Sequence, residues 1–380
     1  MTLFLFTFFI IYSGVHLYAF LKAKAAIVFG AYPSVFLGML MASMIFAPII
    51  VRLSEKSGYE LFARALSYIG YTWMGILFLF FSVSVAIDLY RLIVHLASLS
   101  FKTDFSGIIP SNQTAFFIPL ILAVCIGIYG YFEAKNIKTE KLTIKTSKMP
   151  EGVERLRIVQ ISDVHIGLLV REDRLNRILA EVKKAEPDIF VSTGDLVDGQ
   201  INSLKGLAEL FNLINPRYGK FAITGNHEFY AGIKEAVDFT EKAGFTMLRG
   251  EGLSIDGLIN IVGIDDPAGK GFNFSKVISE KKLLSGFSRE KFTLLLKHRP
   301  LFDKNSPGLF DLQLSGHIHK GQIFPFSIAT WLYYPVNSGG VNLPDNSYMY
   351  VSRGSGTWGP PIRFLSPPEV TVIDIIRSNG

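Results

Sequence analysis

The sequence predicts a chain of two parts, an all-α bundle of about four transmembrane helices followed by an α/β domain of layered sheets. Residues 1–133 carry very few charges, although 18% of the 380 residues are charged. From residue 155 onward, short apolar runs rich in β-branched residues alternate with amphipathic stretches, as strands and helices do in α/β proteins. We therefore divide the chain into a membrane part at 1–133, a linker with a first strand at 134–150, and a globular domain at 151–380.

Four apolar stretches of the membrane part are long enough to cross a bilayer, which takes about 20 helical residues. They are Leu3–Leu21, Tyr32–Val51, Tyr68–Leu89 and Thr114–Tyr131. The first stretch could instead be a signal peptide, but no basic segment precedes it and its apolar run is longer than such peptides have. Because three further spans follow, we favour a polytopic membrane domain.

Lysine and arginine residues indicate the orientation, since they gather on the cytoplasmic side of membrane proteins. With four spans, eight of them share a side with the globular domain: Arg52, Lys56, Arg64, Lys135, Lys138, Lys141, Lys145 and Lys148. The other side has Lys22, Lys24, Arg91 and Lys102. This predicts a multi-pass protein of the cell (inner) membrane with its globular domain in the cytoplasm. We interpret Asp88, Arg91 and His95, on one face near the end of the third span, as an interfacial ion pair.

Strands and helices of the globular domain follow one another in a regular order. Strands are predicted at 155–162, 188–195, 219–226, 259–265, 291–298 and 310–317, and again near 348–354 and 369–376. Helices are predicted at 171–185, 202–215 and 232–244. The last two strands lie in a segment rich in Gly, Pro, Ser and aromatic residues, and we expect them in the second sheet of a sandwich.

Polar residues of metal-binding types follow the carboxyl ends of five predicted strands. They are Asp163, His165, Asp195, Asn226, His298, His317 and His319. Ligands of α/β sheets bind at such strand ends, so these side chains should meet at one rim. If the last loop is extended, His317 and His319 both point to the rim, while Ile318 between them turns away.

The chemistry of these side chains predicts a centre with two metal ions. Imidazole and carboxylate ligands suit Mn, Fe, Zn or similar ions, and seven donors are too many for one ion. Two ions about 3.5–4 Å apart activate a bridging water and hold the oxygens of an in-line phosphoryl displacement. The single cysteine, Cys125, excludes an internal disulfide and a multi-thiolate site. A basic stripe with interleaved aromatic residues is absent, so nucleic acid is not an expected partner.

Five motifs, "DVH", "GDLVD", "GNHE", "KHRP" and "GHIH", resemble in order and spacing those of the calcineurin-like metallophosphoesterase family. The resemblance covers roughly residues 150–380. The flanking segments "GHIHKGQIFPF" and "YVSRGSGTWGPPIRFLSPPEVTVI" resemble the membrane-associated YkuE/YaeI-like branch, which often has Gly in place of Lys320. The resemblance implies a four-layer α/β/β/α sandwich. It also implies hydrolysis of a phosphate mono- or diester, or a pyrophosphate, by a metal-bound hydroxide without a covalent intermediate.

The same resemblance assigns a role to each residue. Asp163, His165 and His319 would hold the first ion, Asn226, His298 and His317 the second, and Asp195 would bridge them. The ions would be Mn, Fe, Zn or Co, with Mn favoured. Together with Asn226, His227 would face the substrate phosphate, and it would protonate the leaving group or stabilise the transition state. Asp198 would accept a hydrogen bond from His227 and fix its ring.

Neighbouring polar residues are expected to be structural. Glu228 would cap or brace the following helix, and Asp265 with Asp266 would form a turn. Arg353 and Arg363 could contact a phosphate, but surface or structural roles are favoured for them. A membrane anchor places the bilayer among the partners and makes a lipid-linked phosphate a candidate substrate, while the oligomeric state stays open. The alternative is a non-catalytic or regulatory module attached to a membrane transporter. A decayed site would have lost ligands, and a transporter would need charges in the middle of its spans.

Overall fold

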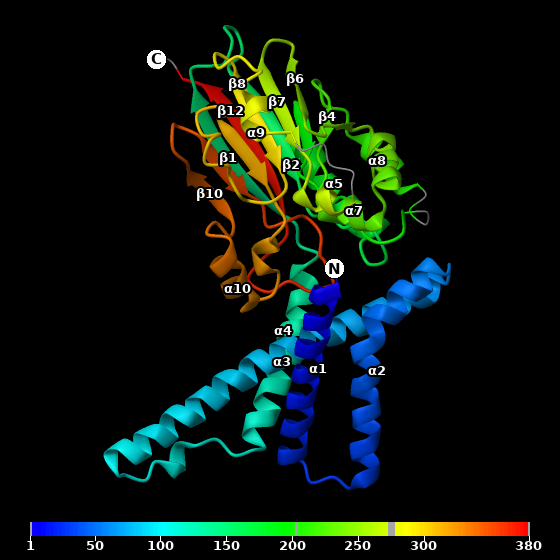
Figure 1. The fold of residues 1–380 in the computed structure, drawn as a ribbon, viewed down its shortest axis with the longest axis vertical. Helices are drawn as coiled ribbons and strands as arrows, with labels where there is room; N and C mark the ends of the chain where they lie inside the picture. Colours follow the sequence, from blue (N-terminus) through cyan, green and yellow to red (C-terminus); the bar gives the residue numbers. More distant parts are fainter. Residues whose placement is uncertain (1, 202–203, 205, 273–277, 379–380) are drawn as a thin grey trace. The chain divides into compact units, whose positions relative to one another are not determined.

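Figure 1 shows the computed structural model, which describes residues 2–201, 204, 206–272 and 278–378. Contacts within the chain divide it into two compact units. The helical unit comprises residues 1–132 with 359–362, and the α/β unit comprises residues 133–358 with 363–380. Each unit is described by itself.

Four long helices make up the helical unit, and each is apolar enough to cross a membrane. They are α1 (Thr2–Ala26), α2 (Ala31–Lys56), α3 (Glu60–Phe101) and α4 (Thr114–Glu133). Small residues lie where these helices approach one another. A Cβ atom added to Gly70 of α3 would lie 2.9 Å from the Cβ of Ala47 in α2, and one added to Gly127 of α4 would lie 3.3 Å from Ile76 of α3. Close packing through small residues is typical of membrane helices.

Helix α3 is much longer than the predicted span, since it contains 42 residues and is therefore about 63 Å long. The expected ion pair between Asp88 and Arg91 is present at 4.0 Å, but both side chains have closer partners. Asp88 accepts a hydrogen bond from Tyr18 of α1 (2.7 Å) and forms its close ion pair with Lys22 of α1, whereas Arg91 is 4.0 Å away. Arg91 instead donates to the carbonyl of Pro110 at 3.1 Å. The prediction missed these contacts because they join residues far apart in the sequence.

Two six-stranded sheets form the centre of the α/β unit. The first has the order β1-β12-β2-β3-β4-β5, with β1 (Lys138–Thr146), β12 (Glu369–Arg377), β2 (Arg155–Ile161), β3 (Ile189–Ser192), β4 (Lys220–Ala222) and β5 (Thr246–Met247). The second has the order β10-β11-β9-β8-β7-β6, with β10 (Gly339–Asn342), β11 (Tyr348–Val351), β9 (Leu312–Ser315), β8 (Phe292–Lys297), β7 (Ile259–Ile264) and β6 (Glu251–Ile255). Strands β2 to β5 are parallel to one another, as are β7, β8, β9 and β11.

Helices cover the outer faces of the two sheets. They are α5 (Glu172–Ala185), α6 (Leu207–Leu210), α8 (Ile233–Lys242) and α9 (Glu280–Leu284). The α/β unit also has α7 (Asn226–Ala231), α10 (Phe326–Tyr333) and 3-10 turns at Phe211–Leu213, Pro267–Phe272 and His319–Gly321, and the helical unit has one at Ser106–Ile108. Val159 of β2 belongs to a core with Leu175 of α5 and Phe239 of α8, whereas its neighbour Ile158 belongs to a core with Ile261 of β7. A smaller core lies between the second sheet and α9. The layers are therefore helix, sheet, sheet and helix, which confirms the predicted α/β/β/α sandwich.

The last strand corrects one prediction, because β12 belongs to the first sheet and not to the second. It lies between β1 and β2, parallel to the former and antiparallel to the latter. Val372 packs toward the helices, and Ile373 packs between the sheets. A strand that is apolar on both faces is stable at an interior position.

The helix predicted at 202–215 is also shorter than expected. The structure has only the four-residue α6 and the 3-10 turn Phe211–Leu213 there, and residues 202, 203 and 205 lie outside the described part. Strands β5, β6 and β10 and helices α7, α9 and α10 were not predicted.

Candidate metal centre

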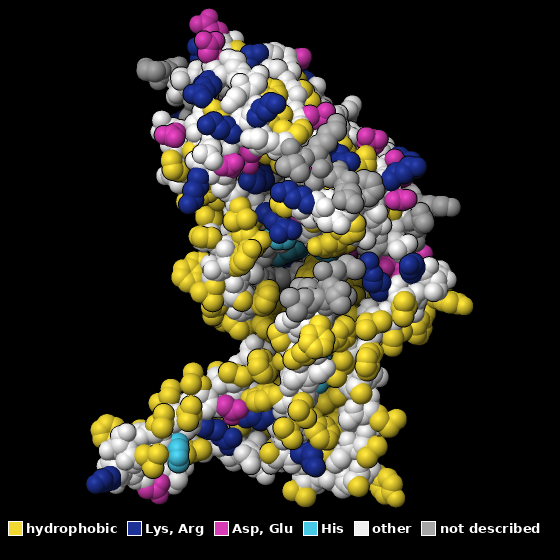
Figure 2. All heavy atoms as spheres, in the orientation of Figure 1, with side chains coloured by type: hydrophobic (Ala, Val, Ile, Leu, Met, Phe, Trp, Pro, Cys, Tyr) yellow, Lys and Arg dark blue, Asp and Glu magenta, His cyan; other side chains and the backbone are white. Residues whose placement is uncertain are grey.

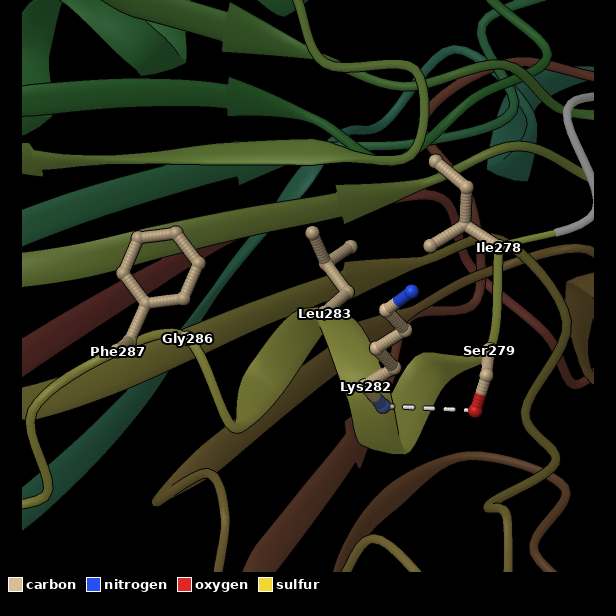
Figure 3. A pocket seen from close by; sticks show the side chains of 6 residues that line it. All are labelled: Ile278, Ser279, Lys282, Leu283, Gly286 and Phe287. Atoms are coloured by element: carbon tan, nitrogen blue, oxygen red, sulfur yellow. Dashed lines mark hydrogen bonds between the residues drawn. The ribbon is translucent and has the colours of Figure 1, made fainter.

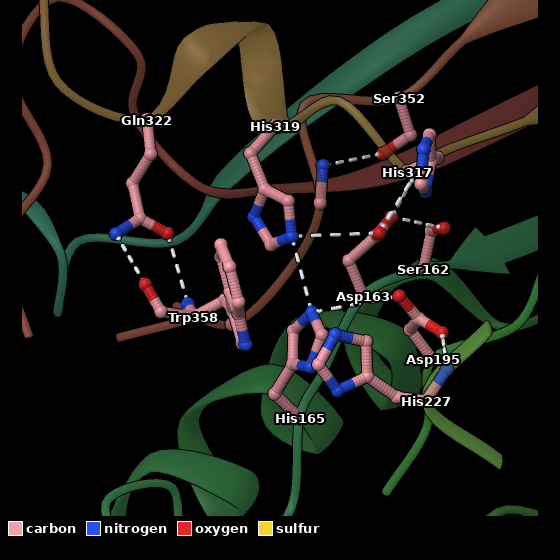
Figure 4. A network of polar contacts seen from close by, with 12 residues as sticks. Ser162, Asp163, His165, Asp195, His227, His317, His319, Gln322, Ser352 and Trp358 are labelled. Atoms are coloured by element: carbon pink, nitrogen blue, oxygen red, sulfur yellow. Dashed lines mark hydrogen bonds and ion pairs between the residues drawn. The ribbon is translucent and has the colours of Figure 1, made fainter. Parts of the chain in front are cut away.

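The seven predicted ligands lie at the carboxyl ends of strands from both sheets. Asp163 and His165 follow β2, Asp195 follows β3, Asn226 begins α7 after β4, His298 follows β8, and His317 and His319 follow β9. The expected single rim is thus made by two sheets, three strands from the first and two from the second. Because the two sheets pack face to face, the ends of their central strands deliver side chains to one place, part of which Figure 4 shows.

One group of donors consists of Asp163, His165 and His319. The Nε2 atoms of the two histidines are 3.1 Å apart, and Nε2 of His319 is 3.4 Å from Oδ1 of Asp163. One donor atom from each of the three residues lies within 4.8 Å of the other two, and all three residues are buried. Three donors so close together can converge on one ion.

A second group consists of Asp195, His298 and His317. Nε2 of His298 is 3.1 Å from Oδ2 of Asp195 and 3.2 Å from Nδ1 of His317. The same Oδ2 atom of Asp195 is 3.9 Å from Nε2 of His165 in the first group. The carboxylate of Asp195 therefore lies between the two groups, where a bridging ligand would stand.

Buried polar atoms in the site have the character of metal donors. Among the described residues, Oδ1 of Asn226 and Nδ1 of His165 are buried without a hydrogen-bond partner. Burying such atoms unpaired is costly, and a cation beside Asn226 would satisfy its oxygen. His298 donates from Nδ1 to the carbonyl of Thr193 at 2.8 Å when it carries its proton there. That tautomer turns the lone pair of Nε2 toward Asp195, as in metal-bound histidines. The residues present fit a pair of divalent ions.

Three of the four candidate histidine ligands have lowered pKa values. His298 differs, because burial by itself would lower its pKa but the charge of Asp195 and the hydrogen bond to it raise the pKa to about 10. Burial, assisted by the charge of His227, lowers the pKa of His165 to about 4. Burial and the charge of His298 lower the pKa of His317 to about 3, and burial holds the pKa of His319 well below its usual value. These three imidazoles are neutral at physiological pH, which is the form that binds metals.

Five of the seven candidate ligands have a left-handed backbone conformation. Their φ angles are 52° for Asp163, 54° for His165, 52° for Asp195, 76° for His317 and 47° for His319. Such a conformation costs a side-chain-bearing residue about 1–2 kcal/mol. Backbone strain of this kind concentrates at functional sites, where it aims side chains that a regular strand would point elsewhere.

The loop with His317 and His319 is therefore not extended, contrary to the prediction. Between two left-handed residues, Ile318 has helical angles of −96° and −6°. The two imidazoles nevertheless both face the site, and Ile318 turns away into a core with Tyr334 and Val351. Alternating backbone conformations produce the outcome that we attributed to an extended chain.

Two glycines allow the backbone to approach the carboxylates. A Cβ atom at Gly225, which precedes Asn226, would lie 2.2 Å from Oδ1 of Asp195. One at Gly316, which precedes His317, would lie 2.2 Å from Oδ2 of Asp163 and would also overlap Ser162. With glycine at position 316, the backbone N–H of His317 can donate to Asp163 at 2.9 Å. These glycines of "GNHE" and "SGHIH" are therefore required sterically.

His227 lies at the edge of the donor groups, with its ring 4.6 Å from that of His165. Its Nδ1 is 2.9 Å from Oδ1 of Asp198, and its backbone N–H donates to Asp195 at 2.8 Å. Burial by itself would lower the pKa of His227, but the carboxylates of Asp195 and Asp198 outweigh burial and raise it to about 9. The imidazole ring of His227 is therefore protonated on both nitrogens and positively charged at neutral pH, and Asp198 fixes its orientation.

Trp358 is a neighbour of the site that the sequence analysis did not single out, although the quoted segment "RGSGTWGPP" contains it. Its ring lies 5.6 Å from the ring of His227. Gln322 holds its backbone through two hydrogen bonds of 2.9 Å (Figure 4). An indole beside the proposed proton donor forms part of the rim of the site.

Glu228 and two arginines have structural contacts, as expected. The carboxylate of Glu228 accepts hydrogen bonds from the backbone N–H groups of Gly225 and Asp195, at 2.6 and 3.0 Å. Arg363 is fully buried and donates to backbone carbonyl groups, including that of Gly356. Arg353 forms ion pairs with carboxylates of the first sheet.

The two aspartates expected to form a turn do more than that. Asp265 forms an ion pair with Arg249 at 2.9 Å, and Asp266 forms one with Arg299 at 2.8 Å. Arg299 directly follows His298, so its ion pair helps to hold the loop that carries this ligand.

An open hollow lies beside α9, apart from the metal-type residues (Figure 3). It is lined by Ile278, Ser279, Lys282, Leu283, Gly286 and Phe287. None of these six side chains is a carboxylate or an imidazole, so the hollow does not share the chemistry of the donor groups.

Comparisons with known proteins agree with the geometry. Residues 156–321 match the family model described as calcineurin-like phosphoesterase. A metallophosphoesterase of Aquifex aeolicus (strain VF5) is 40% identical over 258 residues, which cover 67% of this chain and 98% of that protein. The metallophosphoesterase YkuE of Bacillus subtilis (strain 168) is 33% identical over 268 residues, 67% of this chain and 91% of that one. A transmembrane protein with metallophosphoesterase domain of Danio rerio is 31% identical over 269 residues, which cover 67% of this chain and 61% of that protein.

Proposed function

The chain belongs to the calcineurin-like metallophosphoesterase family, and from that premise we propose that it is a membrane-anchored hydrolase of a lipid-linked phosphate. The bond cleaved would be a phosphate mono- or diester or a pyrophosphate. The observation that carries the proposal is the carboxylate of Asp195, which lies between two groups of imidazole and carboxylate donors. A module that only binds or regulates would not need this complete donor set.

Two divalent ions, with Mn favoured, would lower the pKa of a water molecule and neutralise the oxygens of the phosphate when bound. Asp163, His165 and His319 would hold one ion, and Asn226, His298 and His317 the other, with Asp195 shared. Although burial by itself would raise it, the neighbouring His298 and His227 hold the pKa of Asp195 well below its usual value. Asp195 is therefore ionised and ready to be shared.

His227 supplies the proton in this proposal. Its imidazolium, 2.9 Å from Asp198, can donate to the oxygen of the leaving group or stabilise charge on the phosphate. Asp198 holds the proton on Nδ1 and thereby directs Nε2 to the substrate. Asn226 begins α7 beside His227, so its amide can also contact the phosphate.

The membrane anchor supports a lipid-linked substrate. Four helices are apolar enough to span a bilayer, so the protein meets its substrate at a membrane. We propose that this is the cell (inner) membrane and that the α/β unit faces the cytoplasm, where the basic residues of the loops would place it.

The proposal is tested with the full chain in detergent. The protein is stripped of metal with a chelator and assayed with bis(p-nitrophenyl) phosphate before and after Mn²⁺ is added. We expect turnover that depends on Mn²⁺ and that falls at least about 100-fold in Asp195→Ala and in His227→Ala. Asp238→Ala, an exposed carboxylate on α8, is the matched control and should retain full turnover. Turnover that needs no metal, or that survives both site substitutions, would contradict the proposal.

A further inference from the structure

Helix α10 is mostly apolar and largely exposed, and only Ser327 and Thr330 are partly covered. None of its eight residues is buried. Its large side chains have exposed fractions of 52% for Phe326, 54% for Ile328, 59% for Trp331, 75% for Leu332 and 70% for Tyr333. A helix that packs on a core has one buried apolar face, whereas α10 presents its apolar side chains outward. Figure 2 shows hydrophobic side chains gathered over this part of the surface.

Both ends of α10 are attached to the metal centre. The chain leaves the centre at His319, seven positions before the helix begins. It returns at Tyr334, which is buried and lies edge-on to the ring of His317, with ring centroids 5.6 Å apart. The hydrogen bond from Thr330 to Asn337 (2.9 Å) holds the helix to its return segment. The helix is therefore a fixed part of the rim.

A second exposed apolar segment continues this rim. The backbone of Phe324 donates to the carbonyl of Phe364 at 3.1 Å, and Gln322 binds the backbone of Trp358. The side chains of Trp358 and Leu365 are 51% and 55% exposed. Hydrogen bonds thus join the segment that precedes α10 to a second segment with two exposed apolar side chains, one of which, Trp358, lies beside His227.

The composition of the rim fits a lipid surface better than water. The sequence from 321 to 344 has no Asp, Glu, Lys or Arg. Tryptophan and tyrosine are the residues that gather at membrane–water interfaces, and α10 has both. An exposed apolar patch of this kind marks a surface that another phase or partner covers.

The short connection between α4 and β1 indicates that a lipid bilayer is what covers this patch. Helix α4 ends at Glu133 and β1 begins at Lys138, so the four residues 134–137 join a membrane-spanning helix to the α/β unit. Four extended residues reach about 14 Å at most. The α/β unit therefore stays beside a bilayer throughout the life of the protein.

We propose that α10 is an interfacial helix that inserts Trp331, Leu332 and Tyr333 among the lipids of the bilayer surface. The rim of the metal centre would then lie at the depth of the head groups. On the basis of the proposed function, the site would take phosphates carried by lipids in that surface.

The insertion is measured with the full chain, one copy per phosphatidylcholine nanodisc. The single cysteine is replaced by Cys125→Ser, and Leu332→Cys is labelled with the fluorophore NBD. A lipid with a doxyl quencher at carbon 5 of its acyl chain is then included. We expect at least about twofold quenching at position 332. Leu213→Cys is the matched control, because Leu213 is also exposed (68%) but lies outside the rim, and it should not be quenched. Trp331→Asp with Tyr333→Asp should abolish quenching at position 332.

Three outcomes would overturn the inference. One is equal fluorescence at position 332 with and without the quencher lipid. Another is a blue-shifted probe that the quencher does not reach, which would mean that protein, a second copy included, covers the helix. The third is quenching that persists in the double aspartate variant. None of these readouts needs metal or turnover, so a failed phosphatase assay and a failed insertion are distinguished.

Discussion

His227 and Asp198 form a pair whose contribution to catalysis can be measured separately from any effect on folding. Because Asp198 holds the ring and its charge, Asp198→Asn should reduce kcat and leave the bound metal unchanged. We expect His227→Gln to cost about 100-fold in kcat and Asp198→Asn less than that. The double variant should be no slower than His227→Gln alone, since residues that act as a unit are not additive. Additive losses, or metal lost from Asp198→Asn, would show that Asp198 acts elsewhere.

We expect a larger residue at position 316 to disrupt the metal centre sterically. An added methyl group would collide with Ser162 and with Oδ2 of Asp163, so Gly316→Ala should displace a ligand and lower the metal content measured by mass spectrometry. The control is Gly271→Ala, where no atom lies within 4 Å of the new Cβ. If Gly316→Ala binds the full amount of metal, the close approach is not required.

At the scale of elements, β12 is attached to β2 by the ion pair between Asp374 and Arg157 as well as by backbone hydrogen bonds. The guanidinium donates from Nε and Nη2 to the two carboxylate oxygens at 2.8 and 3.0 Å. The hydrogen bond from Arg157 holds the pKa of Asp374 below its usual value. A depressed carboxyl pKa contributes stability above the unfolded pKa, and that contribution is lost as the pH falls through the folded pKa.

Asp374→Asn should therefore lower the Tm of the α/β unit at pH 7 by roughly 2–4 °C. The difference from wild type should shrink as the pH is lowered from 7 toward 3, the direction in which Asp374 gains a proton. Circular dichroism melts of the full chain in detergent measure it. Asp173→Asn, which removes an exposed pair with Arg177 at 3.4 Å, should change nothing. A Tm difference that is the same at both pH values would contradict the role of the ion pair.

Helix α3 is longer than the membrane span that its sequence predicts. Tyr68–Leu89 was predicted as the third span, but α3 continues to Phe101. The apolar pattern weakens where Arg91 and His95 begin, whereas Leu, Ala and Ile keep the helical backbone favourable. Hydropathy therefore located a region able to cross the membrane, but it did not locate the ends of the helix.

At the scale of the whole molecule, the orientation in the membrane can be decided with two fusions. The excess of basic residues predicts that the α/β unit faces the cytoplasm. Green fluorescent protein fused after Gly380 should therefore fluoresce, and alkaline phosphatase fused there should be inactive. The same reporters fused after Val28, in the loop between α1 and α2, should give the opposite pattern. Active alkaline phosphatase after Gly380 would reverse the orientation.

The sequence alone predicted which candidate ligands would come together and in what order, because they follow apolar runs that form strands. The carboxyl ends of β2, β3 and β4 lie at one edge since those strands are parallel, and the ends of β8 and β9 do likewise. Local pattern therefore sufficed to predict that Asp163, Asp195 and His298 would meet.

Only the tertiary structure decided the features that depend on contacts between distant segments. The place of β12 between β1 and β2, the pairing of Asp88 with Lys22, and the position of Trp358 beside His227 each join residues more than 60 positions apart. The left-handed backbone at His317 and His319 belongs here too, because the surrounding core imposes it against local preference. Sequence periodicity indicates which face of an element is apolar, but it does not indicate what that face contacts. The difference is greatest in α10, whose large apolar side chains are exposed.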